Sequence, residues 1–217
     1  MEDDKFFYSI EKKKKIVQIT LNFLRKLFPN AKSELLYDKP YEFLFAVILS
    51  ARNTDKQVNK TTKSLFVKYD SIEKFANAKI ETLQQDISSI GLYKNKANFI
   101  KKSAQILIEK FNSIVPNNID ELLTLSGVGR KTANVVLGEL YKKNEGIAVD
   151  THVARITYLL NLTKNKDPVK IENDLMAIVP KKNWYEINSL IVLYGRYFWK
   201  ARKEDNGGLL KEIEEKI

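Results

Sequence analysis

Apolar residues recur at helical spacing along nearly the whole chain, with polar and charged positions between them. In a helix this spacing places the apolar side chains on one face, which a globular fold buries. The first such stripe combines Ile16, Ile19, Phe23, Leu24, Leu27 and Phe28, and Pro29 follows it. The same pattern predicts helices over about residues 58–69, 80–90, 97–111, 153–160, 171–178 and 184–203. Gly91 is expected in the C′ position after the stripe at 80–90. The short amphipathic tail after Gly207-Gly208 is expected to be loosely held.

One segment, Phe43–Leu49, is continuously apolar, so periodicity alone does not separate a buried strand from a buried helix. No second convincing strand exists for it to pair with, which favours the helix. The polar Ser50–Asp55 loop follows, in which Thr54 or Asp55 is expected to cap the next helix. The predicted fold class is therefore all-α.

A glycine-rich turn, Ser126-Gly127-Val128-Gly129, separates two short predicted helices. Asn118 is placed to cap the first helix, and the second starts at about Arg130. Glycines allow positive φ and a close approach of the backbone to a ligand. The turn leads into a helix N-terminus, whose N–H groups and dipole favour an anion. Because Lys and Arg are abundant, the expected anion is a nucleic-acid phosphate.

Composition narrows the class of partner. The 217 residues carry a formal net charge of +10, which favours nucleic acid or an anionic membrane, although a generally lysine-rich proteome would give the same balance. No apolar run approaches the roughly 20 residues of a membrane span. The segment Met1–Lys5 is acidic and lacks an apolar signal-peptide region, so we expect a protein that is not secreted.

Cysteine is absent, which excludes disulfides, a catalytic thiol, zinc–thiolate sites and cysteine-ligated iron–sulfur clusters. A single histidine does not favour a histidine-based metal site. We therefore predict no metal and no cofactor.

Two charged residues are the candidate catalytic groups. Lys131 lies in the first turn after the glycine turn, and Asp150 follows 19 residues later in Val149-Asp150-Thr151-His152. The glycine turn, Lys131 and the Val149–His152 segment together closely resemble the corresponding motifs of endonuclease III, a family of helix-hairpin-helix DNA glycosylases. The resemblance runs from about Pro40 to Lys203. The supporting motifs, in the family's order, are Ser50-Ala51-Arg52-Asn53-Thr54-Asp55, Ile90-Gly91-Leu92-Tyr93 and Gly195-Arg196-Tyr197.

The resemblance implies two helical domains that flank a DNA-binding cleft. A central domain would span about residues 32–146, with the helix-hairpin-helix at about 118–141. Residues 1–31 and 147–217 would form a discontinuous second domain. Lys131 would lie on one wall of the cleft and Asp150 on the other.

The implied activity is that of a bifunctional DNA glycosylase/AP lyase, which excises oxidised pyrimidines from duplex DNA in base excision repair. Lys131 would be the nucleophile that forms a Schiff base, and Asp150 would stabilise the positive charge on the sugar and accept a proton. Seen alone, Lys131 is more typical of a phosphate contact and Asp150 of a helix cap. Capping and catalysis are compatible for Asp150.

The DNA-binding residues implied by the resemblance lie on several loops. Leu92 would be a wedge that fills the space of a flipped nucleotide, although core packing is its alternative. Arg52 takes the position that fills the gap opposite the estranged base, where the family typically carries Gln, and we hypothesise that it favours an opposite guanine. His152 would contact the DNA backbone or be an ordinary half-buried polar residue. The hairpin residues expected at the phosphates are Gly127, Val128, Gly129, Arg130 and Thr132.

The C-terminal region departs most from the family. Endonuclease III usually ends with four cysteines that hold a [4Fe–4S] cluster, whereas Trp199 stands where the first cysteine is expected. We hypothesise that Trp199 packs there with Leu209, Leu210 and Ile213. The basic residues Arg196, Lys200 and Arg202 are expected to contact DNA, while complementing the dipole at the end of a helix is the alternative.

Two other functions remain open. One is a monofunctional glycosylase of the same superfamily, acting on a mismatched or alkylated base, and Lys131 argues against it. The other is a non-catalytic helix-hairpin-helix DNA-binding protein. The expected partner is damaged double-stranded DNA, bound by a monomer away from membranes, in the bacterial cytoplasm or in a nucleus or organelle. No residue ranks the damaged bases, and a monovalent cation at the hairpin is suggested by family analogy alone.

Overall fold

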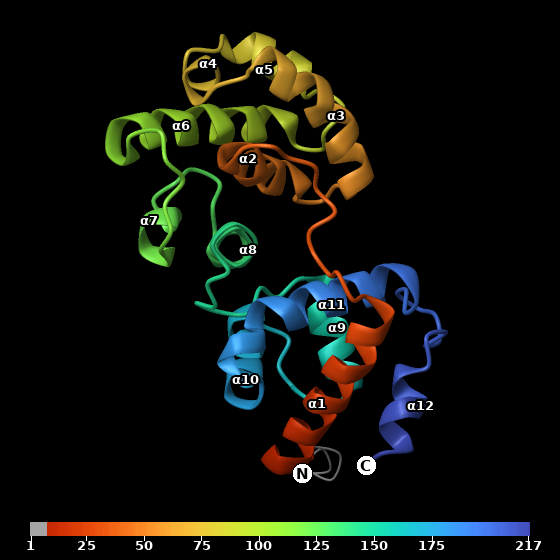
Figure 1. The fold of residues 1–217 in the computed structure, drawn as a ribbon. Helices are drawn as coiled ribbons and strands as arrows, with labels where there is room; N and C mark the ends of the chain where they lie inside the picture. The colour runs from red at the N-terminus through yellow and green to blue at the C-terminus, as the bar shows by residue number, and fades with distance from the viewer. Residues whose placement is uncertain (1–7) are drawn as a thin grey trace. The chain divides into compact units, whose positions relative to one another are not determined.

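A computed structural model of the chain describes residues 8–217 (Figure 1). Within that range the chain is helical and contains no β-strand, which confirms the all-α prediction. The prediction made for Met1–Lys5 falls outside the described residues. No helix in the described range is both long and apolar enough to cross a membrane. The α-helices are α1 (Ile10–Leu27), α2 (Pro40–Ser50), α3 (Asp55–Lys68), α4 (Ile72–Ala76), α5 (Ile80–Asp86), α6 (Tyr93–Phe111), α7 (Ile119–Leu123), α8 (Arg130–Tyr141), α9 (Thr151–Leu159), α10 (Pro168–Ile178), α11 (Trp184–Tyr197) and α12 (Leu209–Glu214), and a 3-10 turn, η2, covers Lys181–Asn183.

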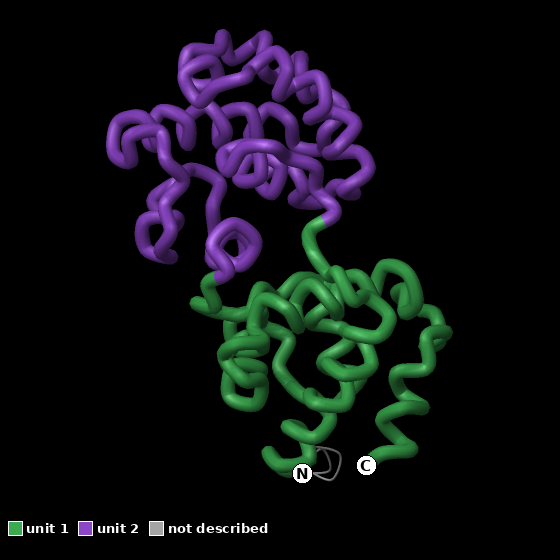
Figure 2. The backbone as a smooth tube through the Cα atoms, viewed as in Figure 1, with its two compact units in different colours: residues 1–33, 143–217 green, residues 34–142 purple. Residues whose placement is uncertain are grey.

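The chain divides into two compact units, and Figure 2 shows them in different colours. Residues 34–142 form one unit, called here the hairpin unit, and residues 1–33 with 143–217 form the other, called the terminal unit. Each unit has a hydrophobic core of its own.

The hairpin unit is built around α2, which packs against α3, α6 and α8. Phe43, Leu44 and Phe45 of α2 are completely buried, so the apolar run is a core helix, as predicted. Aromatic rings extend this core: Phe75 lies 4.9 Å from Phe45 and 4.9 Å from Tyr69 between ring centroids. Rings at such distances attract one another beyond the area that they bury.

The terminal unit joins the first helix to the last four. In this unit, α1 packs against α10, α11 and α12, and α9 packs against α11. Tyr194 of α11 is completely buried at the centre of this core, where its ring meets Phe23 edge-on at 6.3 Å. Burial raises the pKa of the Tyr194 hydroxyl, which accepts a hydrogen bond from the Leu209 N–H at 3.0 Å.

The tail after Gly207 is firmly held, so the expectation of a loose tail is wrong. Leu209 and Ile213 of α12 are buried in the core of the terminal unit. Asp205 accepts hydrogen bonds from Gly207 N at 3.2 Å and Leu210 N at 2.7 Å, and the Tyr194 hydroxyl also donates to it. These bonds fix the chain between α11 and α12.

Two predicted helix ends are wrong. α5 ends at Asp86, and Gly91 is not its C′ residue because its N–H donates to Asn53 Oδ1 at 2.9 Å, outside any helix. α11 ends at Tyr197, before the predicted limit at 203. The amides of Phe198 and Trp199 both donate to the Tyr194 carbonyl at 2.9 Å. The second of these bonds spans five residues, as in the π-turns that end helices, so the helix stops here and the indole of Trp199 enters the core.

Candidate active site

Helix α6 packs against the turn between α7 and α8 through Phe99 and Ser103. Gly127 has a φ of +79°, and a Cβ added to it would lie 2.7 Å from the Cβ and Cγ atoms of Phe99. Ser103 Oγ, also on α6, donates to the Ser126 carbonyl at 2.7 Å. Only glycine fits at position 127, because any larger residue would be strained and would collide with the ring.

Gly129 differs from Gly127, because only Gly127 of the two adopts the positive φ that glycine allows. Its backbone is extended (φ −102°, ψ 177°), where it serves as the N-cap of α8. A Cβ at this position would meet no described atom within 4 Å. The N-terminus of α8 thus has open space beside it, which suits the approach of an anion to the first N–H groups.

The first turn of α8 carries the predicted basic residues. Arg130 and Lys131 are exposed, while Thr132 is half-buried. Val128 is 8% exposed and packs in the core of the hairpin unit. Since its side chain faces inward, only its backbone is available to a phosphate.

The short helix α7 confirms the predicted cap. Asn118 Oδ1 accepts from Glu121 N at 2.9 Å, and Leu122 and Leu125 are buried below the turn. The hairpin therefore presents its turn and the start of α8 outward while its apolar side chains anchor it.

Asp150 is the N-cap of α9, as predicted. Its Oδ1 atom accepts hydrogen bonds from the amides of His152 and Val153, each at 2.8 Å. The preceding segment, Ile147–Val149, is buried, and Asn188 of α11 donates from Nδ2 to the Ala148 carbonyl at 2.5 Å. The carboxylate is therefore fixed by bonds on one oxygen, and its side chain is only half-buried.

His152 packs against a glycine that the sequence analysis left unexplained. A Cβ at Gly195 would lie 2.4 Å from Nδ1 of His152, so the imidazole rests directly on the backbone of α11. The side chain of His152 is half-buried. The glycine of the Gly195-Arg196-Tyr197 motif is thus required by the close packing of α9 on α11.

Arg155 is a residue near Asp150 that the sequence analysis missed. Its Nη2 atom donates to the Trp199 carbonyl, and its guanidinium carbon lies 5.9 Å from the centre of the Trp199 ring. Burial lowers the pKa of Arg155, and the Asp150 carboxylate opposes this shift. Arg155 thus links the segment after α11 to the charge of Asp150, and its place one turn beyond Asp150 was the available signal.

Leu92 and Arg52 lie on two neighbouring loops of the hairpin unit. Leu92 is 55% exposed, so the alternative of core packing is wrong. Both residues have left-handed backbone conformations, with φ of +58° for Arg52 and +61° for Leu92. Non-glycine residues rarely adopt this conformation, and its occurrence often marks a functional loop.

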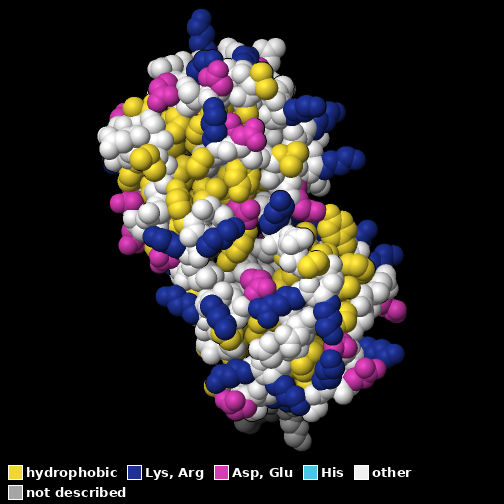
Figure 3. Space-filling view, in the orientation of Figure 1, with side chains coloured by type: hydrophobic (Ala, Val, Ile, Leu, Met, Phe, Trp, Pro, Cys, Tyr) yellow, Lys and Arg dark blue, Asp and Glu magenta, His cyan; other side chains and the backbone are white. Residues whose placement is uncertain are grey.

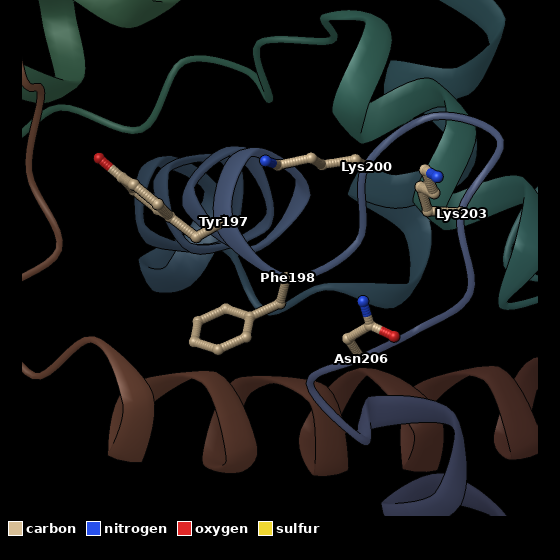
Figure 4. A pocket seen from close by; sticks show the side chains of 5 residues that line it. All are labelled: Tyr197, Phe198, Lys200, Lys203 and Asn206. Carbon is tan, nitrogen blue, oxygen red and sulfur yellow. The ribbon is translucent and has the colours of Figure 1, made fainter.

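The segment after α11 combines the buried Trp199 with exposed basic residues. Trp199 is 4% exposed, whereas Lys200 and Arg202 are exposed and Arg196 is half-buried. A cavity of about 300 Å³ lies here, and Figure 4 shows its lining residues: Tyr197, Phe198, Lys200, Lys203 and Asn206. The ring of Phe198 also meets Phe28 at 6.0 Å between centroids.

Residues 8–217 contain no group of three or more His, Asp or Glu side chains placed to hold a metal ion. Lys and Arg side chains are spread over both units on the face that Figure 3 shows, rather than gathered in one patch. DNA recognition is therefore expected to depend on particular basic residues at the hairpin and loops.

The predicted site residues fall into two groups. The hairpin unit carries Lys131 with the hairpin residues, together with Arg52 and Leu92. The terminal unit carries Asp150 and His152 on α9, and the basic residues at the end of α11.

Comparison with known proteins identifies the class. Residues 45–181 match the profile of the HhH-GPD superfamily of base excision DNA repair proteins, and the chain belongs to this superfamily. Within it, the chain is 44% identical to endonuclease III of Bacillus subtilis (strain 168) over 87% of this chain and 86% of that protein. It is also 44% identical to endonuclease III of Rickettsia conorii over 88% of this chain and 90% of that protein. The chain is thus a member of the endonuclease III family and a DNA glycosylase of base excision repair.

Solved structures agree with this membership. A non-covalent endonuclease III–DNA complex superposes with a TM-score of 0.86 at 41% identity, covering 93% of this chain and 97% of the other. A trapped covalent endonuclease III–DNA intermediate with an estranged adenine gives a TM-score of 0.83 at 43% identity, covering 88% and 89%.

Proposed function

We propose that the protein is a bifunctional DNA glycosylase/AP lyase that excises oxidised pyrimidines from duplex DNA. The observation that carries the proposal is the exposed amine of Lys131, in the first turn of α8 beside the open N-cap at Gly129. Support comes from a similar protein, an endonuclease III that was trapped as a covalent DNA intermediate. A covalent intermediate requires a nucleophile, and a lysine amine is a suitable one.

In the proposed reaction, the neutral amine of Lys131 attacks C1′ of the damaged nucleotide. The C1′–N bond breaks, and the base leaves with the electron pair and takes up a proton. Opening of the sugar ring at O4′ then gives a Schiff base between Nζ and C1′. Loss of a proton from C2′ breaks the C3′–O bond and expels the 3′ phosphate, and water finally hydrolyses the Schiff base to free the amine.

Asp150 supplies the negative charge in this proposal. Positive charge builds on the sugar as the base leaves, and a nearby carboxylate stabilises it. Since Oδ1 of Asp150 already accepts two backbone N–H groups, Oδ2 is the atom proposed to face the sugar and to accept the proton from the amine. The cap thus holds the carboxylate in one orientation before the DNA binds.

The residues proposed to contact DNA are those whose side chains or backbone N–H groups are accessible to solvent. The N–H groups at the start of α8, with Arg130 and Thr132, bind backbone phosphate. Reaching the base requires flipping it out of the stack, and the exposed side chains of Leu92 and Arg52 fill the space left behind. His152, Arg196, Lys200 and Arg202 of the terminal unit are proposed to bind further phosphates.

The enzyme is proposed to work without an iron–sulfur cluster. The chain has no cysteine to hold one, and Trp199 packs with Leu209 and Ile213 in the core of the terminal unit. Apolar packing thus supports the segment that carries Lys200 and Arg202.

Borohydride trapping on a duplex with one thymine glycol tests the proposal. Borohydride reduces a Schiff base to a stable amine, so wild type is expected to give a covalent adduct and Lys131→Ala none. Arg130→Ala is the matched control, because it removes the neighbouring cation but keeps the amine. It is expected to form the adduct with weaker DNA binding.

Other outcomes separate the alternatives. Base release without an adduct would identify a monofunctional glycosylase and give Lys131 another role. An adduct on an abasic-site duplex, but none on thymine glycol, would keep the lyase and change the lesion. Neither adduct nor base release on either duplex would refute the proposal and favour a binding module.

A further inference from the structure

Two loops that are distant in the sequence are joined side by side in the hairpin unit. Asn53, in the loop after α2, accepts a hydrogen bond on Oδ1 from the Gly91 amide at 2.9 Å. Its Nδ2 atom donates to the carbonyls of Leu49 at 3.0 Å and Ala51 at 2.9 Å. Arg52 and Leu92 flank these bonded residues, so the bonds fix the two left-handed positions relative to each other.

A lysine of α6 binds the same two carbonyls from inside the unit. Lys96 Nζ donates to the Leu49 carbonyl at 2.8 Å and to the Ala51 carbonyl at 2.5 Å. The side chain is 3% exposed. Lys96 is also one helical turn beyond Leu92, whose carbonyl accepts from the Lys96 amide at 3.1 Å. One residue therefore connects the start of α6, at Leu92, with the loop that carries Arg52.

Burial of the Lys96 ammonium, considered by itself, lowers the stability of the fold. Removal from water lowers the pKa of Lys96 to about 8, which means that its environment disfavours the charged form. Its hydrogen bonds with the C-terminus of α2 partly offset this, because cations complement the negative end of a helix. Features that oppose folding in this way are expected at functional or strained positions.

We propose that Lys96 is a positioning residue for Arg52. By binding the Leu49 and Ala51 carbonyls, it holds the left-handed backbone of Arg52 at a fixed distance from Leu92. Both side chains then enter the duplex together, with Arg52 toward the strand opposite the flipped nucleotide. This inference rests on the proposed function, which gives Arg52 and Leu92 their place in the DNA.

The test compares substrates with and without an opposite strand. Single-turnover base release is measured on a thymine glycol duplex, and borohydride trapping is measured on a single strand with one abasic site. The single strand offers Arg52 no partner, so it reports only on the reacting amine. The variants are Lys96→Met, Arg52→Ala and the double variant. Lys101→Met is the matched control, because Lys101 is on the same helix and its Nζ donates to the Ala78 carbonyl at 2.7 Å.

Lys96→Met is expected to lower base release from the duplex by about 10- to 100-fold, the range that misplacement of a site by about 1 Å produces. Trapping on the single strand is expected to stay within about twofold of wild type, as is Lys101→Met on both substrates. The double variant is expected to be no slower than Arg52→Ala alone, because Lys96 acts through Arg52.

Three results would overturn the inference: unchanged duplex activity in Lys96→Met, an equal loss on the single strand, or a double variant that shows the product of both single losses. If Lys96→Met does not fold, Lys96→Ala, which also removes the donor but leaves room for water at the two carbonyls, takes its place in the same comparison. Wild type that is inactive on both substrates would instead refute the proposed function, and that result needs none of the Lys96 variants.

Discussion

Trp199 is expected to stabilise the terminal unit in the place where the family usually carries a metal cluster. Its indole is 4% exposed and meets the ring of Tyr194 edge-on at 6.4 Å. A buried tryptophan removes about 150–250 Å² from water, which at about 25 cal/mol per Å² corresponds to roughly 4–6 kcal/mol as an upper limit. Trp199→Ala leaves a cavity, and substitutions of this kind lower the free energy of unfolding by about 3–5 kcal/mol.

Urea unfolding followed by Trp184 fluorescence is the appropriate assay. The chain has two tryptophans, and Trp184 belongs to the same core as Trp199, where its Nε1 donates to the Val179 carbonyl at 3.0 Å. Its emission therefore reports on the terminal unit itself, even if the two units unfold separately. Tyr197→Ala is the control, because that side chain, two residues earlier, is 57% exposed and its removal is expected to cost about 0.5 kcal/mol or less.

A loss below about 1 kcal/mol in Trp199→Ala would refute this reasoning. So would an equal loss in Tyr197→Ala, because the effect would then follow from truncating any aromatic residue near the end of α11.

Three further predictions concern the glycine turn, the buried lysine and the capping carboxylate. Gly127→Ala is expected to destabilise the protein by about 1–3 kcal/mol through its positive φ and its collision with Phe99. Gly129→Ala is expected to leave stability within about 0.5 kcal/mol and to weaken DNA binding. A larger stability loss in Gly129→Ala than in Gly127→Ala by urea unfolding, or unchanged DNA binding by Gly129→Ala in gel-shift titration, would contradict this. Folding lowers the pKa of Lys96 from 10.5 to about 8, so the unfolded chain binds more protons between these values and stability rises with pH. In urea unfolding, the change in stability from pH 7.5 to pH 9.5 should be more favourable in wild type than in Lys96→Met by about 2 kcal/mol, and equal changes in the two proteins would rule out Lys96 as the source. Asp150→Asn is expected to keep the cap and the fold but to slow base release by about 10²- to 10³-fold, and single-turnover rates within tenfold of wild type would exclude a catalytic charge.

The sequence was sufficient for features that depend on local chemistry. Apolar spacing predicted most of the helices but missed the short α4, and the missing partner strand correctly made Phe43–Leu49 a helix. The caps at Asn118 and Asp150 were also predicted, and Thr54 is the cap among the two candidates Thr54 and Asp55, because a cap requires only a short polar side chain and a neighbouring N–H group. The roles of Lys131 and Asp150 in catalysis stay predictions.

Features that depend on distant partners were missed. Gly91 was predicted as a helix terminator, but its amide binds Asn53, 38 residues away. In the sequence, Lys96 is indistinguishable from the other lysines of an amphipathic helix, because its hydrogen bonds to the end of α2 depend on the tertiary fold. Likewise, the early end of α11 follows from the burial of Trp199, which depends on α1 and α12 and not on the helix itself. Spacing along the chain carries no signal for such contacts.

The discontinuity of the terminal unit sets an order on its folding during synthesis. Helix α1 leaves the ribosome before the hairpin unit, but the core that buries its Ile16, Leu21 and Leu24 is completed by α9–α12, more than 100 residues later. The hairpin unit is contiguous, so it can fold in the meantime as one domain. The apolar face of α1 therefore stays without its native partners while residues 34–142 are made. Moving α1 to follow α12 in a circular permutant would remove that delay.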